Sequence, residues 1–294
     1  MGSPAEIHVI VGAIGDAQGR VLIAQRPRGR HMAGRWEFPG GKLAAGEDPL
    51  LGLKRELAEE LGVEVREARR LIRLRHQYSD RHVLLDVWQV TAYDGEARAL
   101  DAQALAWVRP DELPKHDLLE ADRAIVTALR LPRLARALGP RESLQSIRGS
   151  AAQTILVPAP ENGAAGLDAD AVAMARAAGH RVLVMGADVD AVRVAATARC
   201  DGVLLTWLGQ SLHVDRSGAF LVGVHCVDAE GATEAIAEGA HFLVIAPEDG
   251  PLSERLLERL CAMVGRPVFA GWYADARRLE RLQQLGAHGC AVKR

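Results

Sequence analysis

GKLAAGEDPLLGLKRELAEELGV, residues 41–63, is the stretch around which the first half of the chain is organised. Asp48 followed by Pro49 is typical of a helix N-cap and its first helical residue. Apolar residues then recur at the spacing of a helix, and Gly62 follows where a C-terminal glycine is expected. The pattern therefore predicts a helix whose apolar stripe is formed by Leu50, Leu53, Leu57 and Leu61.

Carboxylates occupy another side of this expected helix. Glu56 and Glu60 are four residues apart and Glu59 is three from Glu56, so all three crowd one side, away from the leucines. Carboxylates packed this closely repel one another, and a divalent cation beside them would relieve the repulsion. Oxygen-only ligands favour Mg²⁺ or Mn²⁺. The alternative is an acidic, solvated helix without a bound ion.

The same stretch resembles the Nudix box at every fixed position. That resemblance implies a hydrolase of diphosphate-linked nucleotides, in which acidic side chains hold metal ions that neutralise charge and lower the pKa of a bound water. It implies Glu56, Glu59 and Glu60 as metal ligands, with Gly40 and Glu47 as further candidates. Glu47 has a second reading, as the ion-pair partner of Arg55. The matching positions are Gly41, Glu47, Arg55, Glu56, Leu57, Glu59, Glu60, Gly62 and Val63.

Residues 5–131 resemble the MutT branch of this family, on Arg26, residues 31–34, 36–42 and 80–82. MutT-type enzymes hydrolyse 8-oxo-dGTP to the monophosphate and pyrophosphate. The resemblance implies that the residues of the site have separate roles. Those expected to bind substrate are Arg26 and His31 near the phosphates or ribose, Phe38 lining the base pocket, Arg81 near the purine, Asp122 at the base edge, and Gly40, Gly41 and Lys42. Those expected to be catalytic are Arg55, the three glutamates of the helix, and Asp101 as base or ligand.

Apolar runs outline the remaining elements of the first half. Residues 7–14 and 21–24 suggest a hairpin of two strands. Further strands are expected at 71–76, 83–91 and 107–108, and a second helix at 118–131. Strands around one helix, followed by another, suit a mixed sheet between helices. We therefore expect an N-terminal α/β/α sandwich over residues 1–131.

The second half alternates strand and helix patterns, which implies a parallel sheet with right-handed crossovers. Residues 132–150, rich in Pro, Gly and Arg, suggest a linker, with a short helix at 133–138. Residues 151–294 then suggest a degenerate (βα) TIM-like barrel with about seven strands, one βα unit being missing after residues 155–158. The expected strands are 155–157, 182–185, 203–206, 221–225, 242–246, 268–271 and 290–292.

This half is similar, more weakly, to thiamine-phosphate synthase, on residues 200–206, 222–226, 239–242 and 267–270. The departures from that family fall on its functional positions. Its motif histidine is Leu204 here, and its phosphate-binding glycine pair is Trp272 and Tyr273. Bulky side chains there block close approach of a phosphate to the backbone, so synthase activity is not expected.

Composition narrows the class of protein. The net charge of −2 implies no bulk attraction to polymeric nucleic acid or to a membrane. There is no apolar run long enough to span a bilayer, and the four cysteines suggest buried thiols in a cytoplasmic protein. We expect a Mg²⁺- or Mn²⁺-dependent MutT-like enzyme of nucleotide pool sanitation and DNA repair. Two alternatives are a thiamine-related diphosphate as substrate, and a second half that is a non-catalytic binding module or forms a homodimer.

Overall fold

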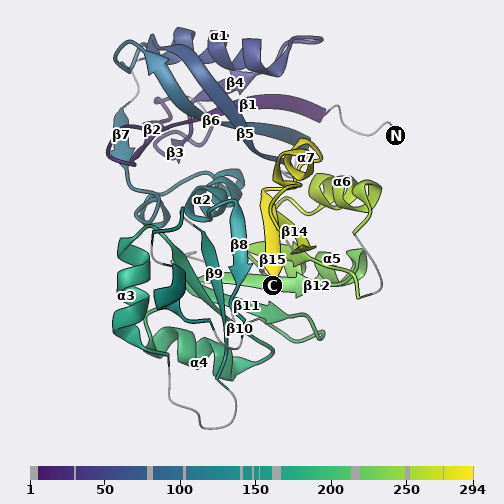
Figure 1. The fold of residues 1–294 in the computed structure, drawn as a ribbon. Coiled ribbons are helices and arrows are strands. Elements are labelled where there is room, and N and C mark those ends of the chain that lie inside the picture. The colour runs from purple at the N-terminus through teal and green to yellow at the C-terminus, as the bar shows by residue number, and fades with distance from the viewer. Residues whose placement is uncertain are drawn as a thin grey trace. The chain divides into compact units, whose positions relative to one another are not determined.

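The computed structural model describes residues 6–29, 31–77, 82–101, 104–139, 142–147, 149–151, 153–160, 167–212, 219–248, 252–273 and 275–293. The chain divides into two compact units, Met1–Arg130 and Leu131–Arg294 (Figure 1). Among the described helices, none combines the length and apolar character needed to cross a membrane.

In the described part of the first unit, seven strands form two sheets. The larger has the order β4-β1-β6-β5 and the smaller the order β3-β2-β7. β1 runs parallel to β6 and the remaining pairs are antiparallel, so the larger sheet is mixed, as predicted. The strands are β1 (Glu6–Ile14), β2 (Val21–Gln25), β3 (Trp36–Glu37), β4 (Gly40–Lys42), β5 (Glu64–Gln77), β6 (His82–Asp94) and β7 (Leu105–Val108).

Two helices, α1 (Pro49–Leu61) and α2 (Arg123–Arg130), pack on opposite faces of the larger sheet. Alternate residues of β1 point to opposite faces. Ile10 and Ile14 belong to the core cluster that holds the leucines of α1, whereas Val11 and Ala13 belong to the cluster that holds α2. The expected α/β/α sandwich is therefore confirmed. The short helices η1 (Leu113–Lys115) and η2 (Glu120–Asp122) lead into α2.

The hairpin expected from residues 7–14 and 21–24 is wrong. β1 and β2 meet at a single bridge, between Gly15 and Val21, and then enter different sheets. β1 pairs with β6 along its whole length, and β2 pairs with β7 and β3. Partners distant in sequence thus replace the local pairing. The helix expected at 118–131 is also shorter, since η2 occupies its start.

The second unit corrects the expectation of about seven strands. Eight parallel strands close into a barrel in the order β10-β11-β12-β13-β14-β15-β8-β9. The gap expected after residues 155–158 is wrong, because β8 supplies the eighth strand and the barrel closes, with β9 paired to β10. The strands are β8 (Leu134–Ala137), β9 (Thr154–Pro158), β10 (Arg181–Gly186), β11 (Gly202–Thr206), β12 (Leu221–Cys226), β13 (Phe242–Ile245), β14 (Val268–Tyr273) and β15 (Gly289–Lys293).

The eighth strand, β8, lies inside residues 132–150, which were expected to be a linker with a short helix at 133–138. Its alternation is clear in the structure: Ala135 and Ala137 are buried in the barrel interior. Hydrogen bonding to β15 on one side and β9 on the other closes the barrel. The same stretch also contains the short helix η3 (Leu144–Ile147).

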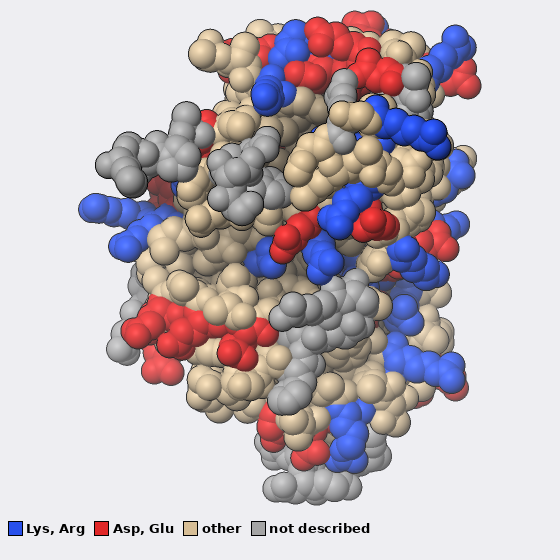
Figure 2. Space-filling view, turned by 180° about the vertical axis from the view of Figure 1, so that it is seen from behind, with Lys and Arg blue, Asp and Glu red and all other residues tan. Residues whose placement is uncertain are grey.

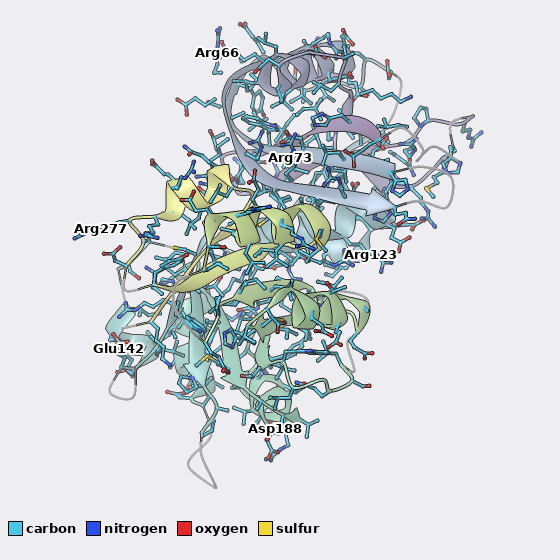
Figure 3. The ribbon with its side chains drawn as sticks, turned by 90° about the vertical axis from the view of Figure 1, so that its right-hand side faces the viewer. Arg66, Arg73, Arg123, Glu142, Asp188 and Arg277 are labelled. Atoms are coloured by element: carbon cyan, nitrogen blue, oxygen red, sulfur yellow. The ribbon has the colours of Figure 1, made fainter. Side chains whose placement is uncertain are left out.

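Large side chains fill the barrel interior, including Phe242 and Phe269, whose rings meet edge to face at 5.9 Å between centroids. Trp272 packs against this interior cluster. Five described helices surround the strands, and several begin with a side-chain cap; Asp188, labelled in Figure 3, caps α4 by accepting from Asp190 N. They are α3 (Ala169–Ala177), α4 (Val189–Thr197), α5 (Ala229–Ala237), α6 (Glu254–Met263) and α7 (Leu279–Gln284).

Candidate active site

The acidic helix forms as its sequence predicts. Asp48 Oδ1 accepts hydrogen bonds from Leu50 N (2.9 Å) and Leu51 N (3.1 Å), and Pro49 begins the helix. Gly62 ends it in the left-handed conformation, at φ 68° and ψ 24°. Leu53, Leu57 and Leu61 are fully buried, and Leu50 is half-buried beside them. The apolar stripe therefore packs α1 onto the core, and the acidic side of the helix faces away from that core. Figure 2 shows acidic side chains gathered over the end of the first unit that α1 occupies in Figure 1.

The backbone of two neighbouring glycines, Gly40 and Gly41, lies close to the side chains of Glu60 and Glu56. Gly40 and Gly41 form part of β4, and Gly40 N donates to Glu60 Oε2 at 3.1 Å. A Cβ added to Gly41 would lie 2.2 Å from Glu56 Oε2. A Cβ added to Gly40, whose φ is 145°, would lie 2.1 Å from Ile10 O. Gly40 thus needs to be glycine because of the backbone beside it, whereas a side chain at Gly41 would displace the Glu56 carboxylate.

Arg55 holds two glutamates in place. Its Nε and Nη2 atoms each donate to one oxygen of Glu47 at 2.9 Å, and Nη1 donates to Glu56 Oε1 at 2.8 Å. Glu59 Oε2 lies 3.5 Å from the same Nη1 atom. The Arg55 hydrogen bonds lower the pKa of Glu47 to about 2, and Glu47 raises the pKa of Arg55. Glu47 was considered either as a metal ligand or as the ion-pair partner of Arg55, and in the structure it forms the ion pair with Arg55.

Glu60 lies in a strongly anionic environment. Burial, followed by the charges of Glu37, Glu56 and Asp101, raises its pKa to about 7, although the Gly40 amide opposes the shift. Every charged neighbour that acts on Glu60 in this way is an acid. Such a cluster stabilises a bound cation and is stabilised by it.

The donor chemistry suits a hard divalent cation, because the converging groups are all carboxylates. In the described ranges, however, no three His, Cys, Asp or Glu side chains stand where they could ligate one ion together. Glu56 is turned toward Arg55, and Glu59 is 61% exposed. The residues therefore fit a metal by their chemistry, and ligation requires these side chains to reorient.

Asp122 marks a second part of the site. It is buried, and its Oδ2 atom accepts from Phe38 N at 3.4 Å. Burial first, and then the charge of Glu37, raises the pKa of Asp122 to about 8, while Phe38 N and Arg26 oppose the shift. Arg26 and Glu37 form an ion pair. At neutral pH the Asp122 carboxyl is therefore largely protonated and can donate as well as accept a hydrogen bond.

The other expected site residues are less closely gathered. Phe38 is buried in the core cluster of α2. His31, Lys42 and Asp101 are exposed, and the backbone oxygen of His31 accepts from Arg26 Nε at 2.8 Å. Arg81 lies outside the described residues.

Glu37 was missed as a site residue, although its charge reaches both Glu60 and Asp122. Its position in residues 36–42, next to Phe38, was the available signal.

Comparisons with known proteins identify relatives of the first unit. The model of the Nudix domain family matches residues 10–128. The CTP pyrophosphohydrolase of Escherichia coli (strain K12) is 37% identical over 127 residues, which cover 43% of this chain and 94% of that protein. The 8-oxo-dGTP diphosphatase of Proteus vulgaris is 44% identical over 91 residues, covering 31% of this chain and 81% of that protein.

A solved MutT Nudix hydrolase from Burkholderia pseudomallei is 32% identical, with a TM-score of 0.38, and is matched over 42% of this chain and 96% of its own. The Nudix box, the carboxylates that meet the glycine pair, and relatives matched over most of their length lead to one conclusion: this chain belongs to the Nudix hydrolase family.

Proposed function

We propose that the first unit is a divalent-metal-dependent nucleoside-triphosphate pyrophosphohydrolase of the MutT type. Its substrate is an oxidised purine nucleotide such as 8-oxo-dGTP, and its products are the monophosphate and pyrophosphate. The role is sanitation of the nucleotide pool, which protects DNA. One observation carries the proposal: Glu60, on which the charges of other acids act, accepts from Gly40 N, and the Glu56 carboxylate lies against Gly41.

In this proposal Glu56, Glu59 and Glu60 hold the metal, together with the carbonyl oxygen of Gly40. A Mg²⁺ or Mn²⁺ held by these residues would neutralise charge on the diphosphate and would lower the pKa of a water bound to it. Arg55 orients Glu56, and Glu47 fixes Arg55, because its two oxygens accept from two nitrogens of the guanidinium.

Proton transfer falls to the carboxylates. Because Glu60 is assigned to the metal, the proton of the attacking water goes to another carboxylate. Asp101, whose charge reaches Glu60, is the candidate and serves as base or ligand.

The remaining residues bind and select the nucleotide. Arg26, His31 and Lys42 are assigned to the phosphates and ribose, and Phe38 and Arg81 to the purine. Asp122, largely protonated at pH 7, offers one donor and one acceptor to the base edge. Oxidation of guanine at C8 turns N7 from an acceptor into an N–H donor and adds a carbonyl acceptor. A group that both donates and accepts suits such an edge.

A second candidate substrate is CTP, which the name of the Escherichia coli relative supports. A carboxyl group can also pair with the amino group and ring nitrogen of cytosine. The two candidates differ in the size and edge of the base, and they share the phosphate chemistry.

The test is a substrate panel with Mg²⁺, comparing 8-oxo-dGTP, dGTP and CTP by pyrophosphate release at matched concentrations. We expect the highest kcat/KM for 8-oxo-dGTP. A higher value for CTP transfers the assignment to the second candidate. Release of orthophosphate, or activity unchanged by removing divalent ions, contradicts the proposed chemistry. Asp122→Ala should lower the preference for 8-oxo-dGTP over dGTP more than it lowers turnover of dGTP.

A further inference from the structure

The segment that follows β6, residues 95–101, packs on the last turn of α1. β6 pairs antiparallel with β5, so the end of β6 lies beside the start of β5, which directly follows α1. Beyond β6 the chain therefore returns to the end of the helix that carries the three glutamates. Gly95 has a φ of 94°, and a Cβ there would lie 3.1 Å from Gly62 O. Glycine at this position lets the two segments cross closely.

Two backbone amides of this segment bond to the end of α1. The last carbonyl oxygens of a helix have no partner within the helix. Arg98 N donates to Leu61 O at 3.0 Å, and Leu100 N donates to Glu60 O at 3.1 Å. Between them, Ala99 N makes no hydrogen bond among the described residues. The segment therefore satisfies two carbonyl groups of the helix and is attached to it through its backbone.

The side chains of the segment contribute less to this attachment. The Arg98 side chain is 73% exposed and pairs with Glu96 at 2.9 Å between Nη2 and Oε2. Leu100 is 56% exposed, whereas Ala97 packs against the core cluster that holds the leucines of α1. Because the larger side chains point into solvent, the two amides set the position of the segment on the helix.

Glu60 is the residue at which three parts of the chain meet. Its carboxylate accepts from Gly40 N in β4, and its backbone oxygen accepts from Leu100 N. The residue after Leu100 is Asp101, whose charge acts on Glu60. A change in the hydrogen bond of Leu100 therefore moves Asp101 relative to the carboxylates of α1.

We propose that Arg98 and Leu100 are positioning residues, whose backbone amides hold Asp101 at the place beside Glu60 that hydrolysis requires. The inference rests on the proposed function, in which Asp101 is base or ligand, and it adds the contacts that place this carboxylate. Asp101 lies outside the helix that carries the other carboxylates, so its position depends on how the segment is attached. A displacement of about 1 Å at a reacting group can lower the rate about 100-fold.

The first test measures amide hydrogen exchange of the full, metal-free chain by NMR. Ala99 is the internal reference, because it is exposed and its amide is unbonded among the described residues. After correction for intrinsic rates, we expect the amides of Arg98 and Leu100 to exchange at least about tenfold more slowly than that of Ala99. Equal exchange at the three amides would overturn the proposal, because the segment would then not be attached to α1 in solution.

The second test measures pyrophosphate release from 8-oxo-dGTP with Mg²⁺ by variants of the segment. Leu100→Pro removes the amide hydrogen, and Leu100→Ala keeps it. Leu100 and Asp101 lie in a turn, and proline is common at the first central residue of a turn. Ala99→Pro is the matched control, because it places the same ring beside an amide that is not used. Thermal denaturation verifies that the variants fold.

We expect Leu100→Pro to lower kcat about 10- to 100-fold and to leave KM nearly unchanged, because Asp101 acts in the chemical step. Leu100→Ala and Ala99→Pro should have kcat values close to that of the native chain. In an Asp101→Asn background, Leu100→Pro should have little further effect, because both changes act through the same carboxylate.

The outcomes separate this inference from the proposed function. An inactive native chain would refute the proposed function and, with it, the role given to Asp101. Native turnover by a folded Leu100→Pro variant, with the native chain active, would overturn the positioning role alone. An equal loss from Leu100→Pro with and without Asp101 would also overturn it, because the amide would then act on the helix itself. Should Leu100→Pro fail to fold, Arg98→Pro removes the other amide hydrogen and takes its place in the same assay.

Discussion

Replacing Gly41 with alanine should separate activity from stability. The added Cβ would lie 2.2 Å from Glu56 Oε2 and 2.5 Å from its carboxyl carbon. An ordinary contact is 3.4 Å or more, so the carboxylate must move by the difference, at least 1.2 Å. Because the obstructing group is the end of a flexible side chain, the backbone can stay in place.

The expected cost falls on catalysis. A misplacement of about 1 Å at a reacting group can lower the rate about 100-fold, so we expect kcat to fall by about that factor. The free energy of unfolding should change by less than about 1 kcal/mol, since the variant also stiffens the unfolded chain. Gly40→Ala should behave differently. Its Cβ would meet the backbone oxygen of Ile10 at 2.1 Å, with φ at 145°, and we expect a loss of about 2 kcal/mol or more.

The assay combines steady-state pyrophosphate release with urea denaturation of the same protein samples. Gly15→Ala is the control, because a Cβ there would meet nothing closer than 3.9 Å, and both its activity and its stability should match those of the native chain. Full turnover by Gly41→Ala would refute the reasoning that catalysis needs the Glu56 carboxylate in the space over Gly41. Unfolding of Gly41→Ala would show instead that the carboxylate cannot move aside.

Three further predictions concern the same unit. Glu60→Gln should lower kcat by on the order of 100-fold or more while the chain stays folded, because the amide cannot ligate a metal as a carboxylate does; turnover at saturating Mg²⁺ measures it, and near-native rates would contradict it. Asp122 has its pKa raised from 3.8 to about 8, so its contribution to stability is present in full below about pH 4 and is lost as the pH rises through 8. The stability of Asp122→Asn relative to the native chain should therefore be higher at about pH 8.5 than at about pH 5. Urea denaturation at the two pH values measures this difference in unfolding free energy, and a difference that does not change with pH would argue against a buried, protonated Asp122. Residues 1–130, which form one compact unit, should fold alone and release pyrophosphate; an inactive soluble fragment would mean that later residues complete the site.

Local chemistry explains why the acidic helix could be predicted to the residue. Its cap, its apolar spacing and its final glycine all act within α1, and the structure confirms Pro49–Leu61. The hydrogen bond between Gly40 and Glu60 was not predicted, because it depends on β4 pairing with β1. Asp122 was assigned through family resemblance alone, since its contact with Phe38 joins residues 84 positions apart.

The closure of the barrel shows where sequence patterns fail. β8 is four residues long, with two alanines facing the interior and two longer side chains outside it, a pattern too short and too weak to predict a strand. What makes it a strand is pairing with β15, more than 150 residues later. Such a pairing is decided by the whole barrel, which is why the expected gap in the barrel was wrong.

Glu37 connects the two parts of the proposed site. Its charge raises the pKa of Asp122 and that of Glu60, and it is held by an ion pair with Arg26. A cation bound at Glu60 would offset the negative charge of Glu37 where the phosphates are proposed to bind. Asp122, where the base is proposed to bind, instead stays protonated beside that charge. The Glu37 carboxylate, in the short strand β3, therefore affects both the protonation of Asp122 and the negative charge that favours a metal at Glu60. Glu37→Gln should lower the pKa of Asp122 and the pKa of Glu60 together, because the charge of Glu37 raises both.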